Sequence, residues 1–117
     1  MITEDIKEAF TSDEHIFQQT VLLREYQFSI KGLSEPDPIK IKIYYDFEYT
    51  RGPYRFELSH YIHTPTQMGP YIPSAPNFES ESLALEYGIS AITEYIGAAI
   101  REGHKLDSKW FVKNEDF

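Results

Sequence analysis

The feature that most constrains the fold is a strict alternation of apolar and polar residues over positions 39–50. Successive side chains of a strand point to opposite faces, so a period of two predicts a β-strand with one buried face. A sheet covered on one side only is typical of antiparallel strands. The apolar phase consists of Ile39, Ile41, Ile43, Tyr45, Phe47 and Tyr49.

A second alternating segment, residues 54–63, follows the dipeptide Arg51-Gly52. A two-residue turn at this dipeptide would bring the apolar faces of the two strands into agreement, with Tyr49 opposite Tyr54. The sequence therefore predicts a hairpin in that register. The other predicted pairs are Phe47 with Phe56, Ile41 with Ile62, and Asp46 with Glu57.

Before this hairpin, residues 3–19 show helical spacing of apolar residues, in one or two pieces. Thr3 is a candidate N-cap, and residues 11–14 resemble a second cap. In residues 20–31 an alternating phase, interrupted at Arg24, predicts a further strand; its apolar members are Leu22, Tyr26, Phe28 and Ile30.

After the hairpin, residues 64–79 contain four prolines, which excludes a continuous helix or strand there. Residues 80–102 predict a long helix that begins at Ser80 or Ser82 and is terminated by Gly103. The tail, residues 105–117, is expected to dock on the domain as a short strand or as an extended segment.

These elements predict one α+β domain over residues 1–117. Its layout is an N-terminal helix, a three-stranded antiparallel meander, a long C-terminal helix packed on one sheet face, and a short extended C-terminal tail. A chain of this length can bury enough surface to fold without disulfides or metals.

The net charge of −8 and the absence of cysteine narrow the classes of partner and chemistry. A polyanion repels phosphate backbones and anionic lipids, so neither nucleic acid nor a membrane is expected as partner. Without cysteine there is no disulfide and no thiolate nucleophile. The acidic start lacks the features of a secretory signal, and no apolar run is long enough to span a bilayer, so a cytoplasmic location is expected.

The order helix, three strands, helix is similar to that of the double-stranded RNA-binding domain. Such domains meet phosphates with a basic helix start, whereas the long helix here opens with Glu79, Glu81 and Glu86. RNA binding is therefore not expected. Acidic secretion chaperones are also similar in size and in the same helix, three-strand, helix beginning, without a shared motif.

Aromatic residues in the proline-rich segment and the tail are the first candidates for a partner-binding surface. Proline lowers the entropy lost when a loop presents its side chains, and loops of this length are often functional. The alternative is that the segment folds over the sheet edge and buries its aromatic rings. The candidate partner-binding residues are Tyr71, Phe78, Met68 and Trp110.

The long helix carries a second stripe beside its main apolar face, formed by Ala84, Tyr87, Ala91, Tyr95 and Ala98. Small residues allow close helix approach, so this stripe predicts a possible homodimer through the 80–102 helix. The alternative is that the N-terminal helix packs on it. A narrow polar edge, which includes Glu86, Ser90 and Glu94, lies next to the stripe.

A different class of function would place a small-molecule pocket between the 64–79 loop and the sheet. Its acid, base or ligand groups would be Asp46, Glu57, His60 and His63. His60 and His63 are three residues apart on a strand and so point to opposite faces, which argues against a shared metal ion. The alternative is an ion-paired sheet face with a hydrogen-bonded core histidine.

No phosphate-binding, nucleophile-elbow or calcium-loop motif is present, and no catalytic residue, cofactor or metal is expected. The sequence favours a non-enzymatic acidic protein-interaction module, meaning an adaptor, an inhibitor, or an immunity- or chaperone-like binder. The alternative is a small-molecule-binding protein or enzyme that uses the four residues of the pocket. Dispersal of those four side chains would favour the interaction module.

Overall fold

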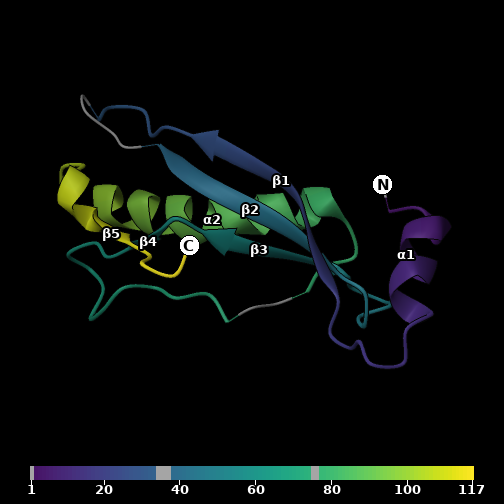
Figure 1. The fold of residues 1–117 in the computed structure, drawn as a ribbon. Coiled ribbons are helices and arrows are strands. Elements are labelled where there is room, and N and C mark those ends of the chain that lie inside the picture. Colours follow the sequence, from purple (N-terminus) through teal and green to yellow (C-terminus); the bar gives the residue numbers. More distant parts are fainter. Residues whose placement is uncertain (1, 34–37, 75–76) are drawn as a thin grey trace.

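The computed structural model describes residues 2–33, 38–74 and 77–117 (Figure 1). The expected α+β layout is confirmed: an N-terminal helix, a three-stranded antiparallel sheet in the order β1-β2-β3, and a long helix on one face of that sheet. The elements are α1 (Glu4–Thr11), β1 (Thr20–Phe28), β2 (Ile39–Asp46), β3 (Tyr54–Leu58), β4 (His60–Ile62), α2 (Glu81–Arg101), the 3-10 turn η1 (Ser108–Trp110) and β5 (Phe111–Lys113).

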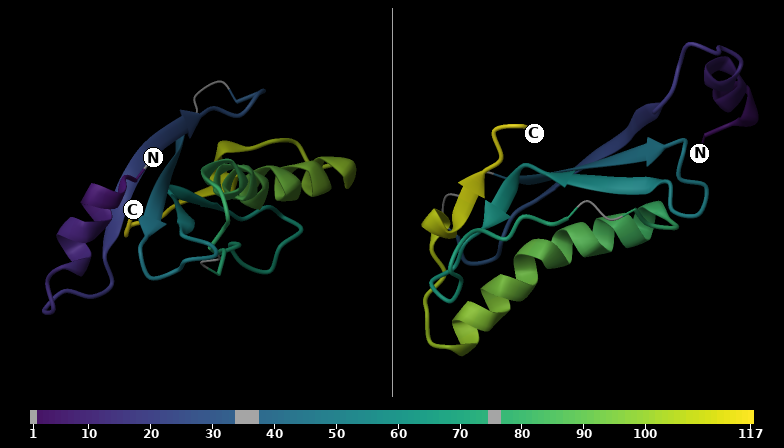
Figure 2. Two further views of the ribbon diagram at one scale, coloured as in Figure 1. Left: turned by 90° about the vertical axis from the view of Figure 1, so that its right-hand side faces the viewer. Right: turned by 90° about the horizontal axis from the view of Figure 1, so that it is seen from below.

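The molecule is elongated, with principal extents of 56 × 25 × 24 Å. The sheet and α2 run along the long axis, and α1 lies beyond the end of the sheet opposite to β4 and β5 (Figures 1 and 2). Within the described ranges, neither helix combines the length and the hydropathy that crossing a bilayer requires.

Both helices begin at side chains that the sequence identifies as caps. The hydroxyl oxygen of Thr3 accepts a hydrogen bond from the backbone N–H of Ile6, and that of Ser80 accepts one from Leu83. These bonds satisfy donors that the first helical turn leaves unpaired. Gly103 follows α2 with φ = +93°, a left-handed conformation that glycine adopts without steric cost.

The expected helical structure over residues 3–19 is wrong beyond Thr11, where α1 ends. The Asp13 carboxylate accepts a hydrogen bond from the His15 N–H at 2.8 Å, a local turn that competes with helix. Gln18 then has φ = +57°, which a helix excludes. The apolar spacing remains, but Phe17 is exposed because no element covers it in the described part of the chain.

The predicted hairpin register is also wrong. β2 pairs with β3 so that Tyr45, not Tyr49, faces Tyr54. The backbone N–H of Asp46 donates to the Pro53 carbonyl at 2.7 Å, so β2 ends there and residues 47–53 form a loop instead of a two-residue turn. The observed register differs from the predicted one by an even number of residues, so every side chain stays on the same face of the sheet. The alternation of apolar and polar residues therefore fits both registers equally well.

The single strand expected over residues 54–63 is interrupted at Ser59. The Ser59 hydroxyl accepts the backbone N–H of Lys40 at 2.7 Å, and the Ser59 N–H donates to the Lys40 carbonyl. Beyond this point the chain pairs with the tail, because β4 and β5 form a separate two-stranded sheet. The tail therefore docks partly as a strand, one of the two forms that the sequence allowed.

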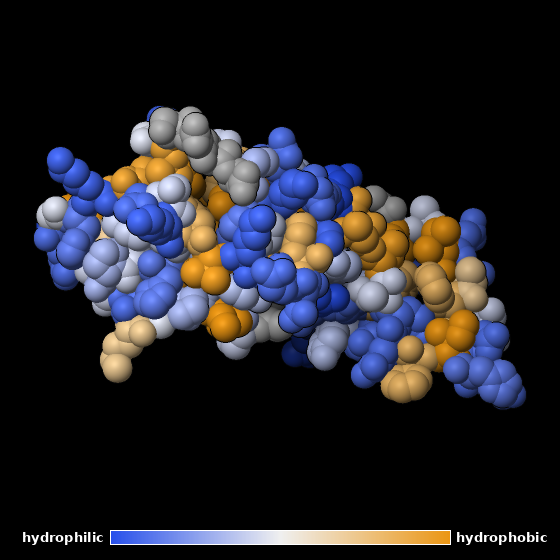
Figure 3. Space-filling model, turned by 60° about the vertical axis from the view of Figure 1, so that its left-hand side comes forward, coloured by the Kyte–Doolittle hydropathy of each residue, from blue (hydrophilic) through white to orange (hydrophobic). Residues whose placement is uncertain are grey.

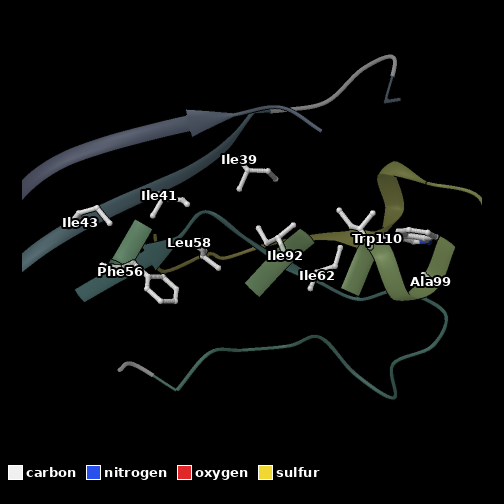
Figure 4. Packing of buried hydrophobic residues seen from close by; sticks show 11 residues of the cluster. Ile39, Ile41, Ile43, Phe56, Leu58, Ile62, Ile92, Ala99 and Trp110 are labelled. Atoms are coloured by element: carbon white, nitrogen blue, oxygen red, sulfur yellow. The ribbon is translucent and has the colours of Figure 1, made fainter. Parts of the chain in front are cut away.

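The core lies between the sheet and α2 (Figure 4). The three-stranded sheet contributes the alternating residues of β2 and the inward residues of β3, so the buried face that the alternation predicts is confirmed. β4, from the second sheet, adds Ile62. α2 contributes Ala84, Gly88, Ile92, Ile96 and Ala99. The tail closes one end of the core with Trp110.

Substitution of two glycines in α2 should change the stability of the protein in opposite directions. A Cβ at Gly97 would meet only the flexible guanidinium of Arg101, so Gly97→Ala should raise the free energy of unfolding by about 0.5–1 kcal/mol through helix propensity. A Cβ at Gly88 would already lie 3.3 Å from Ile41 and Phe56. Gly88→Leu should therefore lower stability by about 1–3 kcal/mol through overpacking. Urea denaturation of both variants tests the contrast, and equal effects would contradict this packing.

Candidate functional site

The connection between β4 and α2 is fastened at its start by Gln67. The Gln67 side-chain amide accepts the Thr64 N–H at 2.7 Å and donates to the Ile62 carbonyl at 3.1 Å. The Tyr71 N–H then donates to the same Ile62 carbonyl oxygen. The connection is thus held against β4 and runs beside α2 (Figure 2). Met68, at its outer bend, is fully exposed.

Two of the predicted contact residues cover part of α2. The ring of Tyr71 lies on Tyr95, with centroids 5.0 Å apart, and the ring of Phe78 lies 4.9 Å from that of Tyr87. Phe78 also stacks on Phe56, so it belongs to the margin of the core more than to the surface. The alternative that the N-terminal helix packs on this stripe is wrong at these two tyrosines, which Tyr71 and Phe78 contact instead.

Trp110, the fourth predicted contact residue, is only 6% exposed and packs in the core. The η1 turn places it there: Asp107 caps this turn through the N–H of Lys109, and the Trp110 carbonyl accepts the His63 N–H. A buried ring cannot present a contact surface, so the assignment of Trp110 to the partner-binding surface is corrected.

Between residues 71–74 and α2 lies a groove of about 520 Å³. One wall is the connection, the other is α2, and the core residue Phe56 contributes to the lining. Tyr87, 58% exposed, leaves much of its ring free for contacts. The groove-lining residues are Phe56, Tyr71, Pro73, Ser74, Glu86, Tyr87, Ser90, Ala91, Glu94 and Tyr95.

The groove is acidic. Glu86 and Glu94 line it, both are exposed, and neither forms an ion pair within the described residues. In contrast, the Glu81 carboxylate at the start of α2 is bound by Arg24 and Tyr26; the hydrogen bond from Arg24 is the largest influence that lowers its pKa. The two groove carboxylates therefore remain available to cationic groups of another molecule.

The four residues of the alternative pocket are dispersed. Asp46 is buried, and its carboxylate accepts hydrogen bonds from Thr20 (2.6 Å), Arg55 (2.8 Å) and Asn77 (3.1 Å). Glu57 faces Lys42 across the strands, so the predicted pairing of Asp46 with Glu57 is wrong. The register error accounts for this, because Asp46 lies beyond the last residue pair of the ladder.

The two histidines are also held separately. His60 is buried, with its Nδ1 2.8 Å from the Ser59 hydroxyl. The Nε2 of His63 lies 3.2 Å from the carbonyl oxygen of Gln67. No group of three or more histidine and acidic residues in the described ranges could hold a metal ion. A small cleft of about 150 Å³ between β3 and Pro73 includes Glu57 but none of the other three.

Sequence reasoning placed the tyrosines and glutamates of the groove on the correct faces of the helix but did not place them in a site. The helical spacing shows Tyr87 and Tyr95 on one stripe and Glu86 and Glu94 on the next. The missing information was the path of residues 71–74, which supply the opposite wall. A homodimer through this helix remains a prediction, although Tyr71 already covers part of the stripe.

Comparison of the chain with protein-family models, with curated proteins and with solved structures finds no match in any of the three.

Proposed function

We propose that this chain is a non-enzymatic protein-interaction module that binds its partner in the groove between residues 71–74 and α2. Adaptors, inhibitors, and immunity- or chaperone-like binders act in this way. The observation that carries the proposal is the combination, in one groove, of exposed tyrosine rings with two unpaired carboxylates. Tyrosine is enriched at protein interfaces because it offers a large apolar surface with a polar tip.

The side chains of the groove support binding over catalysis. Among the described residues, its lining contains no histidine or lysine that could activate a nucleophile.

The dispersal of Asp46, Glu57, His60 and His63 favours the same proposal over the small-molecule alternative. Each has its own local surroundings, and the three hydrogen bonds at Asp46 make that carboxylate a structural anchor. The cytoplasmic location expected from the sequence is part of the proposal. On the face in Figure 3, hydrophobic side chains appear in separate areas among hydrophilic ones.

The test compares two variants with the same change of net charge. Glu86→Lys with Glu94→Lys reverses the charge of the groove, whereas Glu8→Lys with Glu48→Lys reverses two exposed carboxylates outside it. In a pull-down with tagged protein, we expect a stoichiometric protein partner to be lost with the groove variant and retained with the control. Alanine at Phe78 is a poor test, because this ring supports the core.

Both variants should unfold at the same denaturant midpoint as the original chain, which excludes loss of structure as the cause. Partner capture that survives reversal of the groove charges would contradict the proposed binding surface. If no partner is captured by folded protein, a screen of metabolites and metal ions would test the alternative function directly.

A further inference from the structure

The polar residues that α2 presents to the groove recur at every fourth position: Glu86, Ser90 and Glu94. On an α-helix, four residues advance ~6 Å along the axis. In an extended chain, two residues advance ~6.6 Å, and alternate side chains point to the same side. An extended segment that lies along the groove would therefore place every second side chain opposite one of these three positions.

The chemistry at the three positions specifies the side chains that fit them. The carboxylates of Glu86 and Glu94 form no ion pair within the described residues, and the whole chain carries a net charge of −8, so cationic groups are attracted to both of these positions. The rings of Tyr87 and Tyr95 line the groove beside them. A guanidinium group can pair with a carboxylate and also stack on an aromatic ring, which an ammonium group does less well.

The middle position has different requirements. Ser90 and Ala91 are half-buried in the lining and offer no charge. The opposite wall is lined by Tyr71 and Pro73, which are also uncharged. A small uncharged side chain suits this position, because a charged one would find no counter-charge among these residues.

We infer that the groove takes an extended segment of a protein partner that carries arginine residues four positions apart with a small residue midway between them. The inference rests on the proposed function and specifies the partner for the same groove. Arginine at the first and fifth positions reaches the two carboxylates, and the third position faces Ser90. Acidic segments and nucleic acids are repelled by the same charges.

The experiment measures binding of defined peptides by fluorescence anisotropy. The first peptide is blocked at both ends and carries two arginines four positions apart among alanine, glycine and serine. The second has the same composition with the arginines adjacent. The spaced peptide should bind about two- to fivefold more tightly, the order expected when two exposed ion pairs form instead of one, and its affinity should fall as salt is raised.

The matched variants are Glu86→Gln with Glu94→Gln in the groove and Glu8→Gln with Glu48→Gln outside it. These changes keep the side-chain shape and remove only charge. The groove variant should weaken binding of the spaced peptide by about tenfold, and the control should leave it unchanged. A lysine-for-arginine peptide should bind more weakly than the arginine peptide.

Equal affinity for the spaced and adjacent peptides overturns the inference, as does binding that is insensitive to both groove glutamates. No measurable binding of the spaced peptide at about 1 mM overturns it as well. Spermidine binding that competes with the peptide at equal or higher affinity would identify a small polycation as occupant instead. A partner that still depends on the groove charges in the pull-down would leave the proposed function standing in each of these cases.

Discussion

Replacing Ile92 with alanine should lower the free energy of unfolding by about 3–4 kcal/mol. Ile92 is fully buried, at 0% exposure, in the middle of the face that α2 turns toward the sheet (Figure 4). Truncation removes three carbon atoms from the core and leaves a cavity that α2 cannot fill, because its packing against β2 and β3 fixes its position. A domain of this size has a total stability of roughly 5–15 kcal/mol, so the loss would be a large fraction of it.

The matched control for this variant is Ile100→Ala on the same helix. Ile100 is 51% exposed, so its truncation removes little buried surface and should change stability by less than about 1 kcal/mol. Chemical denaturation measures the free energy of unfolding of both variants, provided that its dependence on denaturant concentration has the same slope as in the original chain. Similar losses for the two variants would show that the face of α2 that packs on the sheet has been misidentified.

Replacing Arg55 with leucine should cost about 2–3 kcal/mol at neutral pH, because it leaves Asp46 buried without its cation. The guanidinium of Arg55 donates to both oxygens of the Asp46 carboxylate and also lies over the ring of Tyr44, 4.4 Å from its centroid. The lost contact with Tyr44 adds to the effect, since the Arg55 side chain is itself mostly buried.

The pH dependence of stability distinguishes the charge effect from lost packing. Burial raises the pKa of Asp46, but the hydrogen bonds from Arg55, Thr20 and Asn77 and the charge of Arg55 outweigh it, and the net pKa is lowered from its ordinary 3.8. A lowered pKa in the folded state gives stability that is present above the unfolded pKa and is lost as the pH falls through the folded value. The original chain should therefore lose this contribution below about pH 4.

Burial raises the pKa of Asp46, and in the Arg55→Leu variant no cation offsets this effect. The pKa of Asp46 should therefore be higher in the variant than in the original chain. The stability difference between the original chain and the variant should then shrink as the pH falls from 7 toward 3. Asp46→Asn and the double variant complete a double-mutant cycle that isolates the pair. Stability curves that stay parallel across this pH range would mean that Arg55 acts through packing alone.

The Asp46 cluster also shows where sequence reasoning failed. Three segments far apart in the chain meet at one carboxylate: the start of β1 through Thr20, β3 through Arg55, and the entry to α2 through Asn77. The sequence presented Asp46 as a polar residue in an alternating strand, opposite Glu57. Nothing within a few residues of Asp46 identifies its partners, and the register that would bring them together is not encoded by the alternation.

Features that depend only on neighbouring residues can be predicted from the order of the amino acids. The alternation over Ile39–Asp46 specifies the buried face of β2, and the hydroxyls of Thr3 and Ser80 fix the helix starts. The four prolines in the sequence of residues 64–79 rule out one continuous helix or strand. Period, capping and proline geometry act over one to four residues, so they can be recognised in the sequence directly.

Features that depend on contacts between distant segments are set only when the chain is folded. Folding sets the hairpin register, the break at Ser59, the burial of Trp110 and the pairing of β4 with β5. Folding also creates the groove, because residues 71–74 return alongside α2 and supply the wall opposite the tyrosines and glutamates. Several arrangements satisfy the same local sequence pattern, and the one that forms is selected by the burial and hydrogen bonding of the whole fold.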